Sequence, residues 1–89
     1  MDSYNIQWKK SAEKDLLNID HQQIPRIIKS VESLIKNPFP NQSLKLHGTN
    51  KLYRIRIGDY RVIYQVNSNE NILTIFYVRH RKDVYRKRK

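Results

Sequence analysis

The sequence predicts an α+β fold in which two helices pack on a mainly antiparallel, four-stranded sheet. Two segments with helical spacing of apolar residues stand in the first half of the chain, and three strand-like segments follow one another in the second half. Helices grouped before a run of strands are typical of α+β layer folds. The expected order is strand, helix, helix, strand, strand, strand. A chain of 89 residues has room for one domain, so we expect a single domain over residues 1–89.

The first predicted elements are a strand and a short helix. Aromatic and apolar residues alternate with polar ones over residues 4–8, and this period of two is typical of a strand. Ser11 can cap a helix, and Glu13 and Asp15 then lie early in that helix, where its dipole favours acidic side chains. Apolar residues recur along one face of this helix at Ala12, Leu16 and Ile19.

The clearest helical pattern covers residues 24–35. Its apolar residues form one wide stripe, made of Ile24, Ile27, Ile28, Val31, Leu34 and Ile35. Pro25 fits the first turn, because the N–H that proline lacks has no intrahelical partner there. The short break near Asp20 makes the two helices an αα-hairpin, and the prolines that follow residue 37 end the second helix. A loop is expected over residues 37–50.

A β-hairpin is predicted next, and its register brings arginines together. Glycine at the first central position of the turn Gly58-Asp59 suits a type II′ hairpin between strands 52–57 and 60–66. Arg56 then lies opposite Arg61, and Arg54 shares their face. The other face, which we expect the helices to cover, carries Tyr53, Ile55, Ile57, Tyr60, Val62 and Tyr64.

This pairing of arginines indicates a functional face. Like charges that stand directly opposite each other destabilise a strand pair. An anion bound between Arg56 and Arg61 would remove that cost, and a local conflict of this kind is what a functional site produces. The hairpin therefore presents a candidate anion-binding site.

The last strand is predicted over residues 72–78, after a polar loop. This segment is nearly all apolar, so we expect a central strand covered on both faces. Residues 79–89 are expected to form a helical turn or a short basic tail.

Composition excludes several classes of function. The chain has no cysteine, so neither a disulfide framework nor a thiolate metal site can form. It shows no paired carboxylates, no histidine spacing typical of zinc and no glycine-rich phosphate loop, so we expect no metal and no cofactor. No secretory signal or membrane-spanning segment is visible, and we expect a cytoplasmic protein without a membrane partner.

Positive charge is concentrated in the second half of the chain. The formal net charge is +10, and residues 51–89 hold 11 basic and 3 acidic side chains. Lys and Arg that neutralise phosphates release condensed counterions, so such a segment favours a polyanion as partner.

His80 and Tyr85 add groups that transfer protons beside these cations. Cleavage of RNA without a metal requires removal of the 2′-hydroxyl proton, stabilisation of the phosphorane charge and protonation of the 5′-oxygen. Arginine supplies charge and two-pronged phosphate contacts but is a poor base. The imidazole of His80 has an ordinary pKa near neutrality, whereas the phenol of Tyr85 needs cations to lower its pKa. Both remain candidates for the proton transfer.

Four segments of the chain resemble the RelE/ParE toxin superfamily. They are LYRIRIGDYRVIY at 52–64, VRHRKDVY at 78–85, SAEKDL at 11–16 and KLHG at 45–48. The resemblance covers nearly the whole chain. It implies two N-terminal helices on an antiparallel sheet and a toxin of a toxin–antitoxin pair. RelE-type members of this superfamily enter the ribosomal A site and cut mRNA, with the 2′-hydroxyl as nucleophile.

The resemblance also assigns roles to individual residues. Arg54 and Arg56 match the two basic residues of the family's second strand, and Arg61 matches its phosphate-binding arginine. Arg81 matches the basic residue near the leaving oxygen, and Tyr85 matches the C-terminal tyrosine that assists the 2′-hydroxyl. These five residues are the expected catalytic set.

Further expectations concern substrate contacts and departures from the family pattern. Lys51, His80 and Lys82 flank the expected catalytic residues and are expected to bind the RNA. Arg79 stands where the family frequently has glycine. The implied partners are mRNA, the ribosome and an acidic RelB-like antitoxin; we expect a monomer when free and a heterotetramer with the antitoxin.

Two other functions fit the same sequence. ParE-type toxins inhibit DNA gyrase by binding it, without a nuclease site. A non-catalytic RNA-binding or ribosome-associated protein could use the same basic face. The basic cluster and the tyrosine favour the nuclease.

Overall fold

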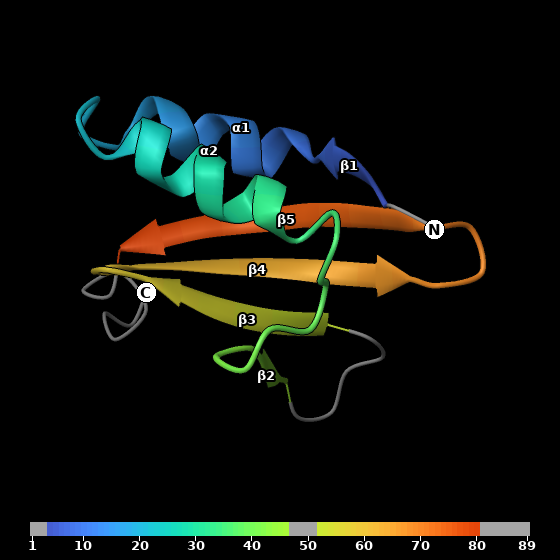
Figure 1. The fold of residues 1–89 in the computed structure, drawn as a ribbon. Helices are drawn as coiled ribbons and strands as arrows, with labels where there is room; N and C mark the ends of the chain where they lie inside the picture. The colour runs from blue at the N-terminus through green and yellow to red at the C-terminus, as the bar shows by residue number, and fades with distance from the viewer. Residues whose placement is uncertain (1–3, 47–51, 81–89) are drawn as a thin grey trace.

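A computed structural model describes residues 4–46 and 52–80 of the chain. Two helices lie on one face of a five-stranded sheet whose strand order is β1-β5-β4-β3-β2 (Figure 1). Along the chain the elements are β1 (Asn5–Trp8), α1 (Lys10–Leu17), α2 (Ile24–Ser33), β2 (Leu44–Lys45), β3 (Leu52–Ile57), β4 (Tyr60–Asn67) and β5 (Ile72–His80). The α+β class and the αα-hairpin are confirmed.

The predicted count of four strands is wrong, because the expected loop 37–50 contains a further strand. Leu44 and Lys45 pair antiparallel with Arg54 and Tyr53 of β3 and form an edge of the sheet. Two residues are too few for the alternation that identifies a strand in sequence. The remaining antiparallel pairs are β3–β4 and β4–β5, whereas β1 joins β5 in parallel.

Helix α1 begins one residue earlier than its predicted cap. Lys9 occupies the N-cap position without a side-chain hydrogen bond. The Ser11 hydroxyl instead donates to the backbone carbonyl of Phe76 in β5, at 2.6 Å. Ser11 is therefore a tertiary contact between helix and sheet, and its prediction as an N-cap is wrong. Helix α2 has proline in its first turn, as predicted, and its stripe buries Ile27 and Val31.

The β3–β4 hairpin has the predicted register. Arg56 pairs with Arg61, Arg54 with Ile63 and Ile57 with Tyr60. Gly58, at the first turn position, has a φ of 60°, the left-handed conformation that glycine adopts without steric cost. The guanidinium of Arg26 from α2 would lie 2.9 Å from a Cβ at this position. Glycine thus serves both the turn and the close approach of α2.

Strand β5 differs from its prediction in coverage and length. Its burial alternates along the strand, with Leu73, Ile75 and Val78 buried and Tyr77 37% exposed, so only one face is covered. The apolar run reflects aromatic residues that do not enter the core. The strand continues to His80, two residues beyond its predicted end. The predicted basic tail beyond that residue lies outside the described part of the chain.

The hydrophobic core lies between the helices and one face of the sheet. The predicted helix-covered face of the hairpin is confirmed, because Ile55, Ile57, Val62 and Tyr64 are buried in it. The Tyr64 hydroxyl donates to the carbonyl of Pro38 at 2.8 Å, which ties the loop after α2 to the core.

No helix in the described part of the chain is long and apolar enough to cross a membrane.

Candidate functional site

Three arginines stand in one row on the face of the sheet opposite the helices. In the strand register Arg56 of β3 pairs with Arg61 of β4, and Arg61 pairs with Arg79 of β5. Residues directly opposite one another point to the same face, and successive residues alternate. The next row on this face consists of Arg54, Ile63 and Tyr77. We call these two rows the arginine face.

Arg61 is the most unusual member of this face. Its side chain is only 8% exposed, although the chain places it between two other arginines. Among the described residues no group accepts a hydrogen bond from its buried Nη1. A buried guanidinium nitrogen without a partner is costly, and the like charges of Arg56 and Arg79 on the neighbouring strands add to that cost. A bound phosphate would supply both the missing acceptor and the missing negative charge.

Arg79 was not among the predicted site residues, but the structure places it opposite Arg61. Its Nε lies 3.2 Å from Oδ2 of Asp15 on α1, and its guanidinium carbon lies 4.5 Å from the centre of the Tyr77 ring. The same carboxylate oxygen accepts the backbone N–H of Val78 at 2.9 Å. Extending the hairpin register to the last strand would have placed Arg79 on the arginine face. The prediction missed this residue because the predicted strand ended one residue before Arg79.

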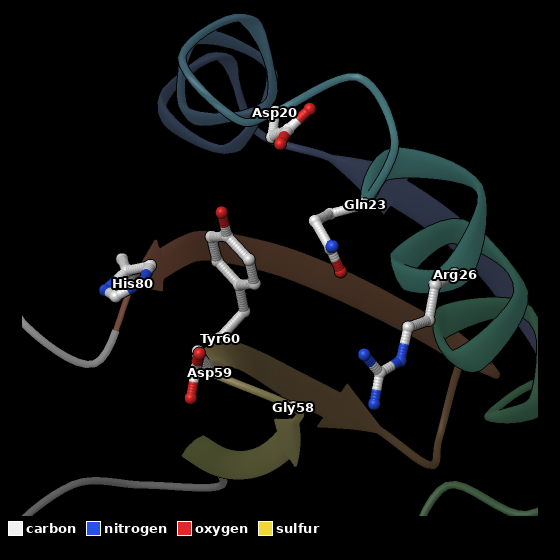
Figure 2. A pocket seen from close by; sticks show the side chains of 7 residues that line it. All are labelled: Asp20, Gln23, Arg26, Gly58, Asp59, Tyr60 and His80. Carbon is white, nitrogen blue, oxygen red and sulfur yellow. The ribbon is translucent and has the colours of Figure 1, made fainter.

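His80 lies on the other face, away from the arginine row. It pairs with Tyr60, and the two rings meet edge to face with centroids 5.1 Å apart. Both rings line a cavity of about 310 Å³ between the hairpin turn and the start of α2 (Figure 2). Asp20, Gln23, Arg26, Gly58 and Asp59 complete its lining. The structure therefore does not bring His80 together with Arg61.

The other predicted site residues divide into two groups. Arg54 is half-buried and Arg56 is exposed, and both lie on the arginine face beside Arg61. Lys51, Arg81, Lys82 and Tyr85 lie outside the described residues. Within the described ranges no three His, Asp or Glu residues are grouped so that they could hold a metal ion. The described part of the site can bind an anion, but its arginines are poor proton carriers at neutral pH.

Comparison with known proteins shows that this chain is similar to toxins of toxin–antitoxin systems. The family described as "ParE toxin of type II toxin-antitoxin system, parDE" matches residues 6–85. A protein of Methanocaldococcus jannaschii that bears the name RelE1 is 29% identical over 86 residues, which cover 93% of this chain and 96% of that protein.

Solved structures agree with this placement. The archaeal RelE–RelB complex from Pyrococcus horikoshii contains a similar chain, with a TM-score of 0.78 and 32% identity over 89% of this chain and 96% of that one. The isolated E. coli RelE toxin is 19% identical and has a TM-score of 0.77, over 98% of this chain and 88% of that one, which shows the shared fold.

Proposed function

This chain belongs to the RelE/ParE superfamily of toxins from type II toxin–antitoxin systems, and we propose that it is a ribosome-dependent endoribonuclease of mRNA. In this proposal the toxin enters the ribosomal A site and stops translation by cutting the message there.

The observation that carries the proposal is the buried side chain of Arg61, which lies opposite Arg56 and whose Nη1 has no hydrogen-bond partner among the described residues. In the proposed reaction the 2′-hydroxyl loses its proton and attacks the adjacent phosphorus. The bond from phosphorus to the 5′-oxygen breaks, the 5′-oxygen takes up a proton, and a 2′,3′-cyclic phosphate remains. Negative charge builds up on the phosphorane oxygens, and cations fixed beside them stabilise it.

Each proposed catalytic residue has a distinct role in this reaction. Arg61 and Arg81 bind and stabilise the phosphate, and Arg54 and Arg56 hold the RNA backbone and the developing charge. Tyr85 is the proposed proton carrier. His80 would take this role only if the RNA reached the helix-covered face, where its ring packs against Tyr60.

The proposal also names partners. We propose that Lys51, His80 and Lys82 also contact the RNA. RelE chains occur in complexes with RelB in solved structures from Pyrococcus horikoshii and Methanococcus jannaschii. We propose an acidic RelB-like antitoxin for this chain, with a monomeric free toxin, a heterotetrameric complex and a cytoplasmic site of action.

The test is mRNA cleavage in a reconstituted translation mixture, mapped by primer extension. Wild-type protein is expected to cut within A-site codons, and only when ribosomes are present. Arg61→Ala is expected to cut about 10²- to 10³-fold more slowly, because it loses a donor to the transition state. Arg26→Ala removes the same charge on the other side of the sheet and should cut at the wild-type rate.

Two results would contradict this proposal. One is a folded Arg61→Ala variant that cuts as fast as wild type, which would remove Arg61 from the site. The other is folded wild-type protein that makes no cut; inhibition of gyrase supercoiling by that protein would then support the ParE-type function, and RNA binding without either activity would support the non-catalytic one.

A further inference from the structure

A cationic side chain lies over each of two aromatic rings at the edge of the sheet. The Lys9 Nζ lies 4.9 Å from the centre of the Phe76 ring, and the Arg79 guanidinium carbon lies 4.5 Å from the centre of the Tyr77 ring. The two ring centroids are 6.4 Å apart. These four residues, which we call the edge cluster, continue the arginine face, because Arg79 pairs with Arg61.

A β-bulge creates this arrangement. Successive residues of a regular strand point to opposite faces. Between the pairs Ile63–Tyr77 and Tyr64–Ile75 the register shifts by one residue, and Phe76 is the extra residue. Bulges redirect side chains and often lie next to functional sites. Here the bulge brings two successive rings into contact beside a basic surface.

Helix α1 fixes the cation at one end of the cluster. Asp15 holds the Nε of Arg79 and also accepts the N–H of Val78, so the guanidinium is anchored to the strand it belongs to. The Arg79 side chain nevertheless remains 42% exposed, and Tyr77 is 37% exposed. Packing of α1 requires neither an exposed ring nor a guanidinium held over it. The cluster is therefore a preformed stacking surface that is open to solvent.

We propose that the edge cluster binds single-stranded RNA by stacking an unpaired base on Tyr77 and Arg79, while Lys9 contacts the backbone. This inference rests on the proposed function and adds a base-binding site to the phosphate-binding arginine face. Bases stack on aromatic rings and on guanidinium planes, and proteins that bind single strands combine such platforms with a positively charged groove. Tyr77 lies one strand across and two residues along from Arg61, about 8 Å at standard sheet spacings. A nucleotide whose phosphate is held by Arg61 can place its own or a neighbouring base there.

Binding to a short, fluorescently labelled 2′-O-methyl RNA tests this inference, because that RNA cannot supply the attacking hydroxyl and is not cut. A set of such RNAs would carry one abasic site at successive positions. Tyr77→Ala is expected to weaken binding of the intact RNA roughly 5- to 150-fold, the range measured for loss of one stacked base. Tyr77→Phe keeps the ring and should bind within about twofold of wild type.

The abasic RNAs separate stacking from a structural role of the tyrosine. For wild-type protein one abasic position should weaken binding by about the same factor as Tyr77→Ala does. For Tyr77→Ala that same position should have no further effect. If the two losses multiply instead, the base at that position does not stack on Tyr77.

A pair of lysine variants supplies a control matched for charge. Lys9→Gln should weaken RNA binding more than Lys10→Gln, although both remove one charge from neighbouring positions at the start of α1. Equal effects would show that only the net charge matters and would remove Lys9 from the site. If Tyr77→Ala binds RNA like wild type, the whole inference is overturned. This holds also if that variant instead loses binding of an acidic protein partner, because the edge cluster would then bind protein and not RNA.

Cleavage measured on the same proteins distinguishes this inference from the proposed function. Base-dependent binding by a protein that never cuts mRNA would support the edge cluster and contradict the nuclease. Cleavage that is unchanged in Tyr77→Ala, together with unchanged binding, would support the nuclease and overturn the edge cluster.

Discussion

Arg61 links stability and function at the scale of one residue. Its guanidinium is 8% exposed, and its buried Nη1 has no partner among the described residues. A buried polar group without a partner is costly, and replacing buried ionic groups with apolar side chains of similar volume is often neutral or stabilising. We expect Arg61→Met to raise the free energy of unfolding by about 1 kcal/mol or more while RNA cleavage is lost. Urea denaturation measures the first effect; a less stable variant would contradict it, and Arg56→Met at an exposed position is the control.

Tyr64 predicts how stability depends on pH. Burial is the largest cause that raises the pKa of this phenol, from 10.0 to about 12; neighbouring Tyr53 adds to the increase, and a hydrogen bond with the Ser43 side chain opposes it. The folded state therefore keeps its proton at a pH where the unfolded state has lost it. Stability from this group is complete below pH 10 and falls as pH rises towards 12, by roughly 2 kcal/mol.

The variant Tyr64→Phe isolates this effect. At neutral pH it should be less stable than wild type by about 1 kcal/mol, because the carbonyl of Pro38 loses its hydrogen bond. Between pH 10 and 12 the wild type should lose that advantage, since phenylalanine does not titrate. A difference between the two proteins that stays constant with pH, in thermal or urea denaturation, would contradict the assignment.

At the scale of elements, α1 protects the part of β5 that β1 does not reach. Strand β1 pairs with β5 only from Ile72 to Ile75, so the backbone beyond that point faces outwards. Ser11 donates to the Phe76 carbonyl, and Asp15 accepts the N–H of Val78. A helix thus supplies side-chain partners to backbone groups that an unpaired edge would leave open to another strand.

This arrangement predicts the effect of removing one partner. Asp15→Ala should lower the free energy of unfolding by about 1–2 kcal/mol, because the part-buried N–H of Val78 loses its acceptor. Lys14→Ala, at an exposed neighbouring position, should change it by less than about 0.5 kcal/mol. Urea denaturation of the two variants makes the comparison, and equal stabilities would show that water replaces the carboxylate.

At the scale of the whole molecule, the net charge of +10 predicts steep salt dependence of RNA binding. For single strands the logarithm of affinity falls with the logarithm of salt concentration, with a slope of about −0.7 per neutralised phosphate. If Arg54, Arg56, Arg61 and the proposed Arg81 each contact a phosphate, the expected slope is about −3. Arg56→Gln should reduce its magnitude by about 0.7, whereas Arg26→Gln should leave it unchanged. A slope near zero would exclude phosphate contacts on the arginine face.

The sequence by itself determined the local arrangement of the fold and the opposed arginines of the β3–β4 hairpin. The period of each helix and strand, the prolines after residue 37 and the turn at Gly58 are properties of a few neighbouring residues. A two-residue turn fixes which residues of its strands face each other, so the opposition of Arg56 and Arg61 followed from the sequence and is confirmed.

Only the tertiary structure decided how distant segments meet. Ser11 and Asp15 find their partners at Phe76 and Val78, which lie far away in the chain. The bulge at Phe76 and the edge strand β2 depend in the same way on pairing between strands, and β2 is too short to show a period. Such contacts depend on how helices and sheet compete to bury surface and satisfy backbone groups, which local patterns do not encode. For the same reason the burial of Arg61, the anchoring of Arg79 and the separation of His80 from the arginine row became visible only in the folded chain.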